Sequence, residues 1–358
     1  MSPSSRGTAD RPRLAVVFGG RSSEHEVSCL TARNVVAVVD REAFDVLTVG
    51  ITTDGAWVRD PMDWDGLEAG TLPSVAPDLP PFSWDDLRDV DVVFPLLHGP
   101  WGEDGTIQGL LEMAGVRYVG AGVLASAAGM DKPFTKSLFS AGGLPQVPHV
   151  TVLPQQWADP AGRERVLDRV RALGMPVFVK PSRAGSSSGV TKVDHADDLE
   201  AAVESARAFD PKVVVEAAAR GKRELEVGVI QRPDGTPWAS VVGEVVQAPD
   251  SQHAFYDFEA KYLDGTSSNV VPADVPDSVA EQVRTYAVQA FAALGCEGLA
   301  RVDFFLTDDG LVINEINTMP GFTSTSMFPV LWQATGVDYA ELVGRLLDLA
   351  LERPVGLR

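Results

Sequence analysis

The sequence predicts an α/β protein, α+β in parts, in which an N-terminal domain with a largely parallel sheet precedes two further mixed domains. Two observations lead to this fold class. Short apolar runs alternate with segments of helical spacing through the first 130 residues, and later strand-like runs flank turn signals such as the Asp-Gly pair at 234–235. At 358 residues the chain also exceeds the size of one ordinary hydrophobic core.

The N-terminal domain is expected over residues 13–130. LAVVFGG at 14–20 has the composition of a short buried strand that ends in glycines, and the segment 28–40 has helical spacing. The runs at 44–51 and 90–99 repeat the strand pattern. Because strands joined by helical crossovers pair in parallel, we expect one largely parallel sheet.

A small central domain is expected over residues 131–220, in the order strand, helix, hairpin, helix, strand. The corresponding segments are 147–153, 160–174, 176–193, 195–209 and 212–219.

The C-terminal domain is expected over residues 221–358, from an opening hairpin to a closing helix. Within it, residues 248–269 follow no period and contain four aromatic side chains. A stretch of this length predicts a lid that packs over a site, and the alternative is a mobile insertion.

Composition restricts the function. The net charge of -20 argues against binding to nucleic acid or to an anionic membrane, so an anionic ligand would need a local cluster of Lys and Arg. The two cysteines give no disulfide framework and favour a reducing cytoplasm. Residues 1–12 lack the apolar centre of a signal peptide and are expected to form a disordered tail.

NEINTMPG at 314–321 ends a strand-like run and carries an acid and an amide on one strand face. A hairpin through the preceding Asp-Asp-Gly, read as a three-residue turn, sets Asp303 opposite Glu315 and Arg301 opposite Asn317. Directly opposed carboxylates repel unless a cation lies between them. Two acids and one amide suit Mg²⁺, whereas the alternative is a solvated polar face.

The hairpin tip at 185–189 is rich in Gly and Ser and has Lys180 at its base. Backbone N–H groups and hydroxyls in such a turn can hold phosphate, with the lysine as a point charge. The Walker A ending is absent, and a merely flexible tip is the alternative.

Three further residues follow the ends of predicted strands or domains. Glu24 lies beyond the first strand, where it could hold an ammonium group or complement a helix dipole. His98 could act as a base or orienting donor, or be a structural histidine. Lys132 could be a second phosphate lysine or a solvated one. The glycines near Glu24 lack the full spacing of the dinucleotide fingerprint, which excludes a Rossmann site.

Taken together, these segments resemble a D-alanine:D-alanine ligase of the ATP-grasp superfamily. The resemblance covers nearly the whole chain except the tail and a proline-rich stretch. It is carried by FGGRSSEHEVS (18–28), HGPWGEDGTIQGLLE (98–112), GMDK (129–132), VKPSRAGSSSGV (179–190), YDFEAKY (256–262), ARVDFF (300–305) and NEINTMPGFTSTSMFP (314–329). Such a fold would divide into an N-terminal domain, a central lid domain and a C-terminal catalytic domain.

The resemblance implies the ligation of two D-alanine molecules to D-alanyl-D-alanine at the expense of ATP, through a D-alanyl phosphate, for peptidoglycan precursors. The implied ATP-binding residues are Lys132, Lys180, Ser186, Ser187, Glu216 and Glu224. Glu216 would meet the adenine and Glu224 the ribose. Asp303, Glu315 and Asn317 would hold two Mg²⁺ ions, for which Mn²⁺ is an alternative.

The same resemblance implies the substrate residues. Glu24 would bind the first ammonium group with His98 nearby, while Arg301 and the N–H of Gly321 would stabilise the oxyanion. The second carboxylate would meet Ser326, the N–H of Met327 and Lys261. Tyr262 would bond to Ser186 and Glu24 and so hold the lid down.

Two other interpretations stay open on the sequence. A related ligase could use D-lactate or D-serine as its second substrate, although the intact EAKY of the lid favours D-alanine. A nucleotide-binding module without catalysis is the other class. A homodimer is expected from the family.

Overall fold

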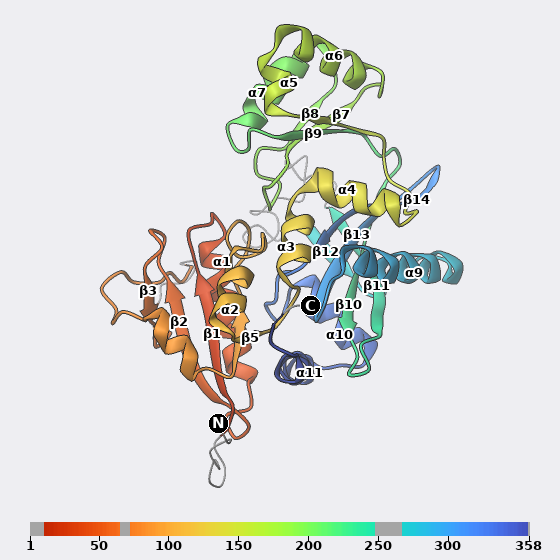
Figure 1. Cartoon of the computed structure of the whole chain (residues 1–358). Coiled ribbons are helices and arrows are strands. Elements are labelled where there is room, and N and C mark those ends of the chain that lie inside the picture. The colour runs from red at the N-terminus through yellow and green to blue at the C-terminus, as the bar shows by residue number, and fades with distance from the viewer. Residues whose placement is uncertain (1–10, 65–71, 248–266, 357–358) are drawn as a thin grey trace.

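The computed structural model describes residues 11–64, 72–247 and 267–356, whose strands form three sheets. The sheets belong to three bodies that follow the chain in order, and the central body lies at one end, above the junction of the other two (Figure 1). Residues 267–269, the end of the predicted lid, form the start of a strand; the rest of that prediction lies outside the described residues.

The N-terminal sheet has the strand order β3-β2-β1-β4-β5, and all neighbours except β2 and β3 are parallel. The predicted, largely parallel sheet is therefore confirmed. Its strands are β1 (Arg13–Gly19), β2 (Asp45–Ile51), β3 (Trp57–Arg59), β4 (Val92–Pro95) and β5 (Arg117–Tyr118). Its helices are α1 (His25–Val38) and α2 (Thr106–Ala114), and a short 3-10 helix covers Trp84–Asp89.

Gly19 and Gly20 turn the chain sharply at the carboxyl end of β1. Both have positive φ, and a Cβ on Gly19 would lie 2.4 Å from the carbonyl oxygen of Ile51. Only glycine fits this combination of close approach and left-handed backbone. The turn starts the loop that leads into α1, at the end of the sheet nearer the central body (Figure 1). Glu24 is the N-cap of α1, at the end of this loop.

The central sheet is antiparallel with the order β6-β9-β7-β8. Its strands are β6 (His149–Val152), β7 (Val177–Pro181), β8 (Thr191–Val193) and β9 (Val213–Ala217). Apolar side chains of the sheet pack on α5 (Pro154–Ala158), α6 (Pro160–Arg171) and α7 (Leu199–Arg207), the last preceded by a 3-10 turn at Ala196–Asp198. The predicted order of strand, helix, hairpin, helix and strand is confirmed.

The C-terminal sheet is also antiparallel, with the order β12-β11-β10-β13-β14. Its strands are β10 (Arg223–Gln231), β11 (Pro237–Gln247), β12 (Ser267–Val270), β13 (Leu299–Thr307) and β14 (Gly310–Asn317). The helices that follow or cover it are α9 (Asp277–Leu294), α10 (Met327–Thr335) and α11 (Tyr339–Glu352).

The β13–β14 hairpin has the predicted register at the site but a different turn. Thr307 pairs with Gly310, so only two residues form the turn, and the expectation of a three-residue turn is wrong. A register shift after Asp303 leaves Asn314 as an extra residue, which is a β-bulge. The bulge restores the pairing of Asp303 with Glu315 because it adds the residue that the shorter turn lacks.

Helices α3 (Val123–Met130) and α4 (Lys132–Ala141) connect the N-terminal body to the central one. Phe139 and Leu144 belong to the apolar core of the C-terminal sheet and α9, so residues 131–144 pack there. The separate core of the central body begins at β6, later than the predicted boundary at residue 131.

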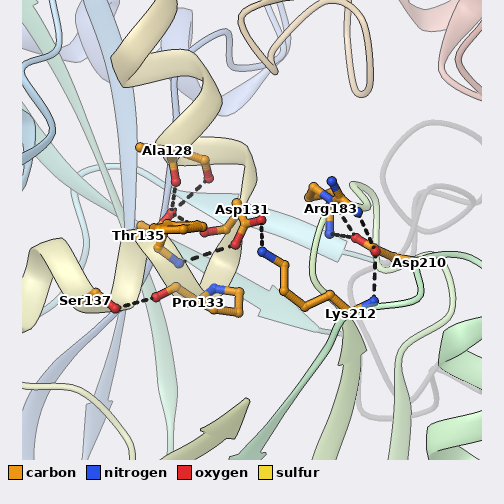
Figure 2. Close-up of polar contacts among 10 residues, drawn as sticks. Ala128, Asp131, Pro133, Thr135, Ser137, Arg183, Asp210 and Lys212 are labelled. Atoms are coloured by element: carbon orange, nitrogen blue, oxygen red, sulfur yellow. Dashed lines mark hydrogen bonds and ion pairs between the residues drawn. The ribbon is translucent and has the colours of Figure 1, made fainter. Parts of the chain in front are cut away.

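Polar contacts fix the α3–α4 junction. The hydroxyl of Thr135 donates to carbonyl oxygens of α3, and the carboxylate of Asp131 accepts from the backbone N–H of Phe134 (Figure 2). Asp131 also forms an ion pair with Lys212 of the central body. Within that body, the Arg183 guanidinium donates to Asp210 through two N–H groups at 2.8 Å. The start of α4 is therefore tied to the central body by charge as well as by the chain.

Cys29 and Cys296 are both free and buried, as the cysteine count predicted. Burial raises the pKa of both thiols, that of Cys296 to about 12. Among the described helices, none is both long and apolar enough to cross a membrane.

Candidate active site

A cavity of about 230 Å³ lies where the three bodies meet. It collects four lysines and an arginine in a chain whose net charge is -20, as an anionic ligand would require. Of the predicted site residues, those that line it are Glu24, His98, Lys132, Lys180, Ser186, Ser187, Glu216, Glu224, Arg301, Asp303, Glu315, Asn317 and Gly321. Lys261 and Tyr262 lie outside the described residues.

Three carboxylates form a row across the floor of the cavity. Glu226 on β10 pairs in register with Asp303 on β13, which pairs with Glu315 on β14. The next row of the same ladders holds Gly228, Arg301 and Asn317. Side chains two residues apart share a face of a strand, and the three acids, Arg301 and Asn317 all line the cavity.

Arg301 supplies the positive charge within these rows. Its Nε lies 2.7 Å from Asp303 Oδ1 and 2.9 Å from Glu226 Oε2, and a second nitrogen donates to Asp303 Oδ2 at 2.7 Å. Burial alone would lower the pKa of the guanidinium, but the charges of Asp303 and Glu226 raise it well above its ordinary value. Arg301 therefore stays charged and offsets the repulsion between the acids.

The donor set agrees with a hard divalent cation. Asp303 and Glu315 present carboxylates, and Asn317, whose amide donates to Asp303 at 3.0 Å, adds a carbonyl oxygen. Within the described ranges, no three His, Cys, Asp or Glu side chains form a metal-holding group. The predicted set, with two acids and one amide, matches Mg²⁺, which takes few protein ligands and completes its shell with phosphate oxygens and water.

Lysines gather on the opposite side, around Glu216 of β9. Lys180 Nζ lies 2.6 Å from Glu216 Oε2, and Lys136 Nζ of α4 lies 2.8 Å from Glu216 Oε1. Lys132, at the first position of α4, donates to the carbonyl oxygen of Ala184 at 2.8 Å. Burial lowers the pKa of Lys132, and the charges of neighbouring lysines act in the same direction.

Glu216 is ionised at neutral pH. Burial by itself would raise its pKa, but Lys136 and Lys180 outweigh that effect and hold the pKa well below its usual range. A depressed folded-state pKa contributes stability that is present above the unfolded-state pKa and is lost as the pH falls below it.

We therefore expect Glu216→Gln to flatten the acid limb of the stability curve. Below about pH 4, the free energy of unfolding of the variant should fall less steeply with pH than that of the wild type, by up to about 1.4 kcal/mol per pH unit. Guanidinium unfolding at a series of pH values measures both slopes. Parallel acid limbs would contradict the depressed pKa.

The Gly/Ser loop of the central body reaches the N-terminal body across the cavity. The hydroxyl of Ser186 donates to Glu24 Oε1 at 2.5 Å. Ser186 and Ser187 both have positive φ, an uncommon conformation for residues other than glycine that marks a tight turn. A Cβ on Gly185 would lie 2.9 Å from Glu24 Oε2, so the small residue allows this approach.

His98 lies at the wall of the cavity beneath this contact. Its Nδ1 is 3.3 Å from the carbonyl oxygen of Met319 and 3.6 Å from a carboxylate oxygen of Glu103, while Nε2 is 3.2 Å from the hydroxyl of Thr31. Burial opposes the charged form, but Glu103 outweighs it and the pKa of His98 is raised. His98 is held on both ring nitrogens, which suits an orienting role.

Ser326 and Met327 do not line the cavity. Ser326 is the N-cap of α10, its hydroxyl is 2.7 Å from that of Thr323, and Met327 is the first residue of the helix. The side chain of Met327 is buried against Leu331. The backbone N–H groups at this helix start are still donors of the kind that bind carboxylates.

The sequence reasoning missed four charged residues of the cavity, among them Glu226, Lys136 and Glu103. Glu226 lies two residues after Glu224 on one strand, and Lys136 lies four residues after Lys132 on one helix, so each shares a face with a predicted residue. Glu103 belongs to the same glycine-rich segment as His98. Strand and helix periods put the first two on the same faces as Glu224 and Lys132, but only the fold brings those faces to the cavity.

The comparisons with known proteins agree over the whole length. The profile described as D-ala D-ala ligase N-terminus matches residues 13–121, and that described as D-ala D-ala ligase C-terminus matches residues 138–348. The D-alanine–D-alanine ligase of Mycobacterium ulcerans is 51% identical over 383 residues, covering 100% of each chain. That of Mycobacterium bovis is 52% identical and covers 97% of each chain.

Two solved structures are similar as well. The VanG D-Ala:D-Ser ligase of Enterococcus faecalis has a TM-score of 0.80 and 33% identity, and the alignment covers 95% of this chain and 100% of that one. The D-alanine–D-alanine ligase of Coxiella burnetii has a TM-score of 0.78 and 32% identity, with 96% and 95% covered. With profiles of both halves matched and relatives above 50% identity at full length, the chain belongs to the D-alanine–D-alanine ligase family, which has the ATP-grasp fold.

Proposed function

We propose that this protein joins two D-alanine molecules to D-alanyl-D-alanine with ATP, through a D-alanyl phosphate, for peptidoglycan precursor synthesis. The observation that carries the proposal is the single cavity in which a row of opposed acids faces a cluster of lysines, with Glu24 and Arg301 between them. This is the arrangement that phosphoryl transfer to a carboxylate needs, because that chemistry depends mainly on positioning and charge.

The nucleotide would lie between the lysines and the acid row. Lys132 and Lys180 provide positive charge for the phosphates, and the loop at Ser186 and Ser187 covers them. Glu216 would accept a hydrogen bond from the adenine, and Glu224 would meet the ribose hydroxyls. Asp303, Glu315 and Asn317 would hold Mg²⁺, which when bound neutralises charge on the phosphates.

Acyl phosphate formation requires the first D-alanine to be oriented. Glu24 would hold its ammonium group, so that a carboxylate oxygen attacks the γ-phosphorus while the bond to the β-phosphate oxygen breaks and ADP leaves. Arg301 and the N–H of Gly321 would stabilise the charge on the substrate carbonyl oxygen, and both residues line the cavity.

Peptide bond formation follows when the deprotonated amine of the second D-alanine attacks the acyl carbon and phosphate leaves. The start of α10, with Ser326 and the N–H of Met327, would hold the carboxylate of this substrate. Lys261 would assist, and Tyr262 would bond to Ser186 and Glu24. Such a lid keeps water from the acyl phosphate.

A phosphate-release assay tests the proposal. The protein, ATP and Mg²⁺ are mixed with D-alanine alone, or with D-alanine and either D-lactate or D-serine, and products are identified by mass spectrometry. D-Alanyl-D-alanine should be the main product. Phosphate release that is independent of D-alanine would contradict the proposal.

D-Serine is the second candidate for the nucleophile, because a structural relative is a D-Ala:D-Ser ligase. The same assay separates the two, since a mixed dipeptide in excess over D-alanyl-D-alanine would favour D-serine. A cytoplasmic homodimer remains a prediction, to be checked by the mass of the protein in solution.

We expect Gly185→Ala to weaken D-alanine binding. The new methyl group would lie 2.9 Å from Glu24 Oε2, so the Glu24 carboxylate or the loop must shift, which breaks the Ser186–Glu24 hydrogen bond. The KM for D-alanine should rise about tenfold or more, because one charge-assisted hydrogen bond contributes about 1.5–3 kcal/mol.

Gly109→Ala is the matched control, because a Cβ at this position in α2 meets nothing within 4 Å. Steady-state kinetics at saturating ATP measure both variants. An unchanged KM in Gly185→Ala would mean that the loop does not need this approach to Glu24.

A further inference from the structure

Glu216 is paired with two lysines from different bodies of the protein. Lys180 comes from the neighbouring strand β7 of the central sheet and contacts Oε2, whereas Lys136 comes from α4 and contacts Oε1. One carboxylate thus faces two ammonium groups, one on each oxygen. A single cation would be enough to balance its charge.

The two lysine side chains differ in solvent exposure and in the number of carboxylates that act on their charge. The side chain of Lys136 is 2% exposed, and Glu216 is the one carboxylate within ion-pair distance of it in the described part of the chain. Lys180 is 16% exposed, and Glu315 and Glu224 also act on its charge across the cavity. Lys180 can therefore turn toward an anion in the cavity. Lys136 has no second carboxylate within ion-pair distance among the described residues.

The support of Lys136 is rigid. Helix α4 packs into the core of the C-terminal sheet through Phe139, and Gln146 donates to the carbonyl oxygen of Lys136 at 2.9 Å. The first turn is fixed by Thr135 and by the Asp131–Lys212 pair (Figure 2). In Figure 1, α4 lies between the central body and the C-terminal sheet. Lys136 therefore contacts Glu216 from a helix whose position is fixed.

We propose that Lys136 is a positioning residue of the nucleotide site: it neutralises Glu216 from inside the protein and so leaves Lys180 available for the polyphosphate. The proposal rests on the proposed use of ATP. A buried carboxylate that loses its counter-ion is strongly unfavourable. Without Lys136, Lys180 would be the one cation paired with Glu216 among the described residues, and it could not leave Glu216 for a phosphate without that cost.

Lys136→Met tests this role, because methionine is an unbranched side chain only one atom shorter than lysine and carries no charge. Tripolyphosphate and adenosine are titrated separately by calorimetry. Affinity for tripolyphosphate should fall about tenfold or more, because Lys180 stays on Glu216, whereas affinity for adenosine should change by less than about twofold. The KM for ATP should rise in parallel with the tripolyphosphate effect.

A double variant distinguishes a positioning role of Lys136 from a loss of affinity that is caused by a damaged fold. In Glu216→Gln the amide needs no counter-ion, so adding Lys136→Met should leave tripolyphosphate affinity within about twofold of Glu216→Gln alone. Both charges of the buried pair are removed together in this variant, so it tests the coupling even where Lys136→Met alone folds poorly. Lys192→Met, on exposed β8, is the matched control and should bind both probes as the wild type does.

Equal losses for adenosine and tripolyphosphate, or no loss for either, would overturn the proposal. So would a tenfold effect of Lys136→Met that persists in the Glu216→Gln background. Neither titration depends on turnover. A wild-type protein that binds both probes but releases no phosphate with D-alanine would refute the proposed function and not the role of Lys136.

Discussion

Replacing Glu315 by alanine should lower kcat by about 10²–10³-fold while the protein stays folded. Glu315 faces Asp303 across the β13–β14 hairpin, so its proposed task is to hold Mg²⁺ at the phosphates. The side chain is half-buried, and its removal also relieves repulsion between opposed acids. Unfolding free energy should therefore change by less than about 1 kcal/mol.

The measurement is the rate of phosphate release as a function of Mg²⁺ concentration, together with thermal unfolding. Glu315→Ala should need more Mg²⁺ for half-maximal rate. Asp309→Ala, in the turn of the same hairpin, is the control and should match the wild type. A Glu315→Ala protein with normal turnover at normal Mg²⁺ would remove the metal assignment.

Arg301→Met should damage both the rate and the fold. As one of two proposed donors to the oxyanion, Arg301 accounts for about 10²–10³ in kcat. It also pairs with Asp303 and Glu226, and its side chain is only 12% exposed. Breaking a buried ion pair leaves uncompensated charge, so we expect a loss of about 3–5 kcal/mol in unfolding free energy.

Arg301→Lys distinguishes the two effects. Lysine keeps the charge between the acids but cannot reproduce the two-nitrogen contact, so stability should recover more than the rate does. Arg284→Met, at a partly exposed pair on α9, controls for the loss of an arginine as such. Denaturant unfolding and kcat are measured on all three. Normal stability in Arg301→Met would contradict the charge balance inferred for the acid row.

Motif and pattern were enough to predict the opposed acids of β13 and β14, but not every member of the acid row. Alternation along a strand places Glu315 and Asn317 on one face, and pairing across a hairpin adds Asp303, all within 15 residues of sequence. Glu226 is distant in sequence and enters only through the pairing of β10 with β13. Which strands become neighbours depends on the packing of the whole sheet.

The turn of the β13–β14 hairpin was also not predictable from the sequence, although it involves only neighbouring residues. The expected three-residue turn and the observed two-residue turn with a bulge give one register at Asp303, because each supplies one extra residue. The sequence does not distinguish them, since local turn preferences differ little in free energy. The position of α4 was also beyond sequence reasoning, because an apolar helix face can pack against either neighbouring body. In the structure, Phe139 packs in the core formed by the C-terminal sheet and α9.

The sequence by itself determined the α/β class, the order of elements and the residue types of the site, because periodicity and turn chemistry act over a few residues. Only the tertiary structure decided that Lys136, Glu226 and Glu103 join that site and that Glu216 is shared by two lysines. These contacts join segments far apart in the chain. They exist because apolar cores, one of them shared by the N-terminal and C-terminal bodies, hold the three bodies around one cavity. Burial there makes each charge depend on partners that no local pattern reveals.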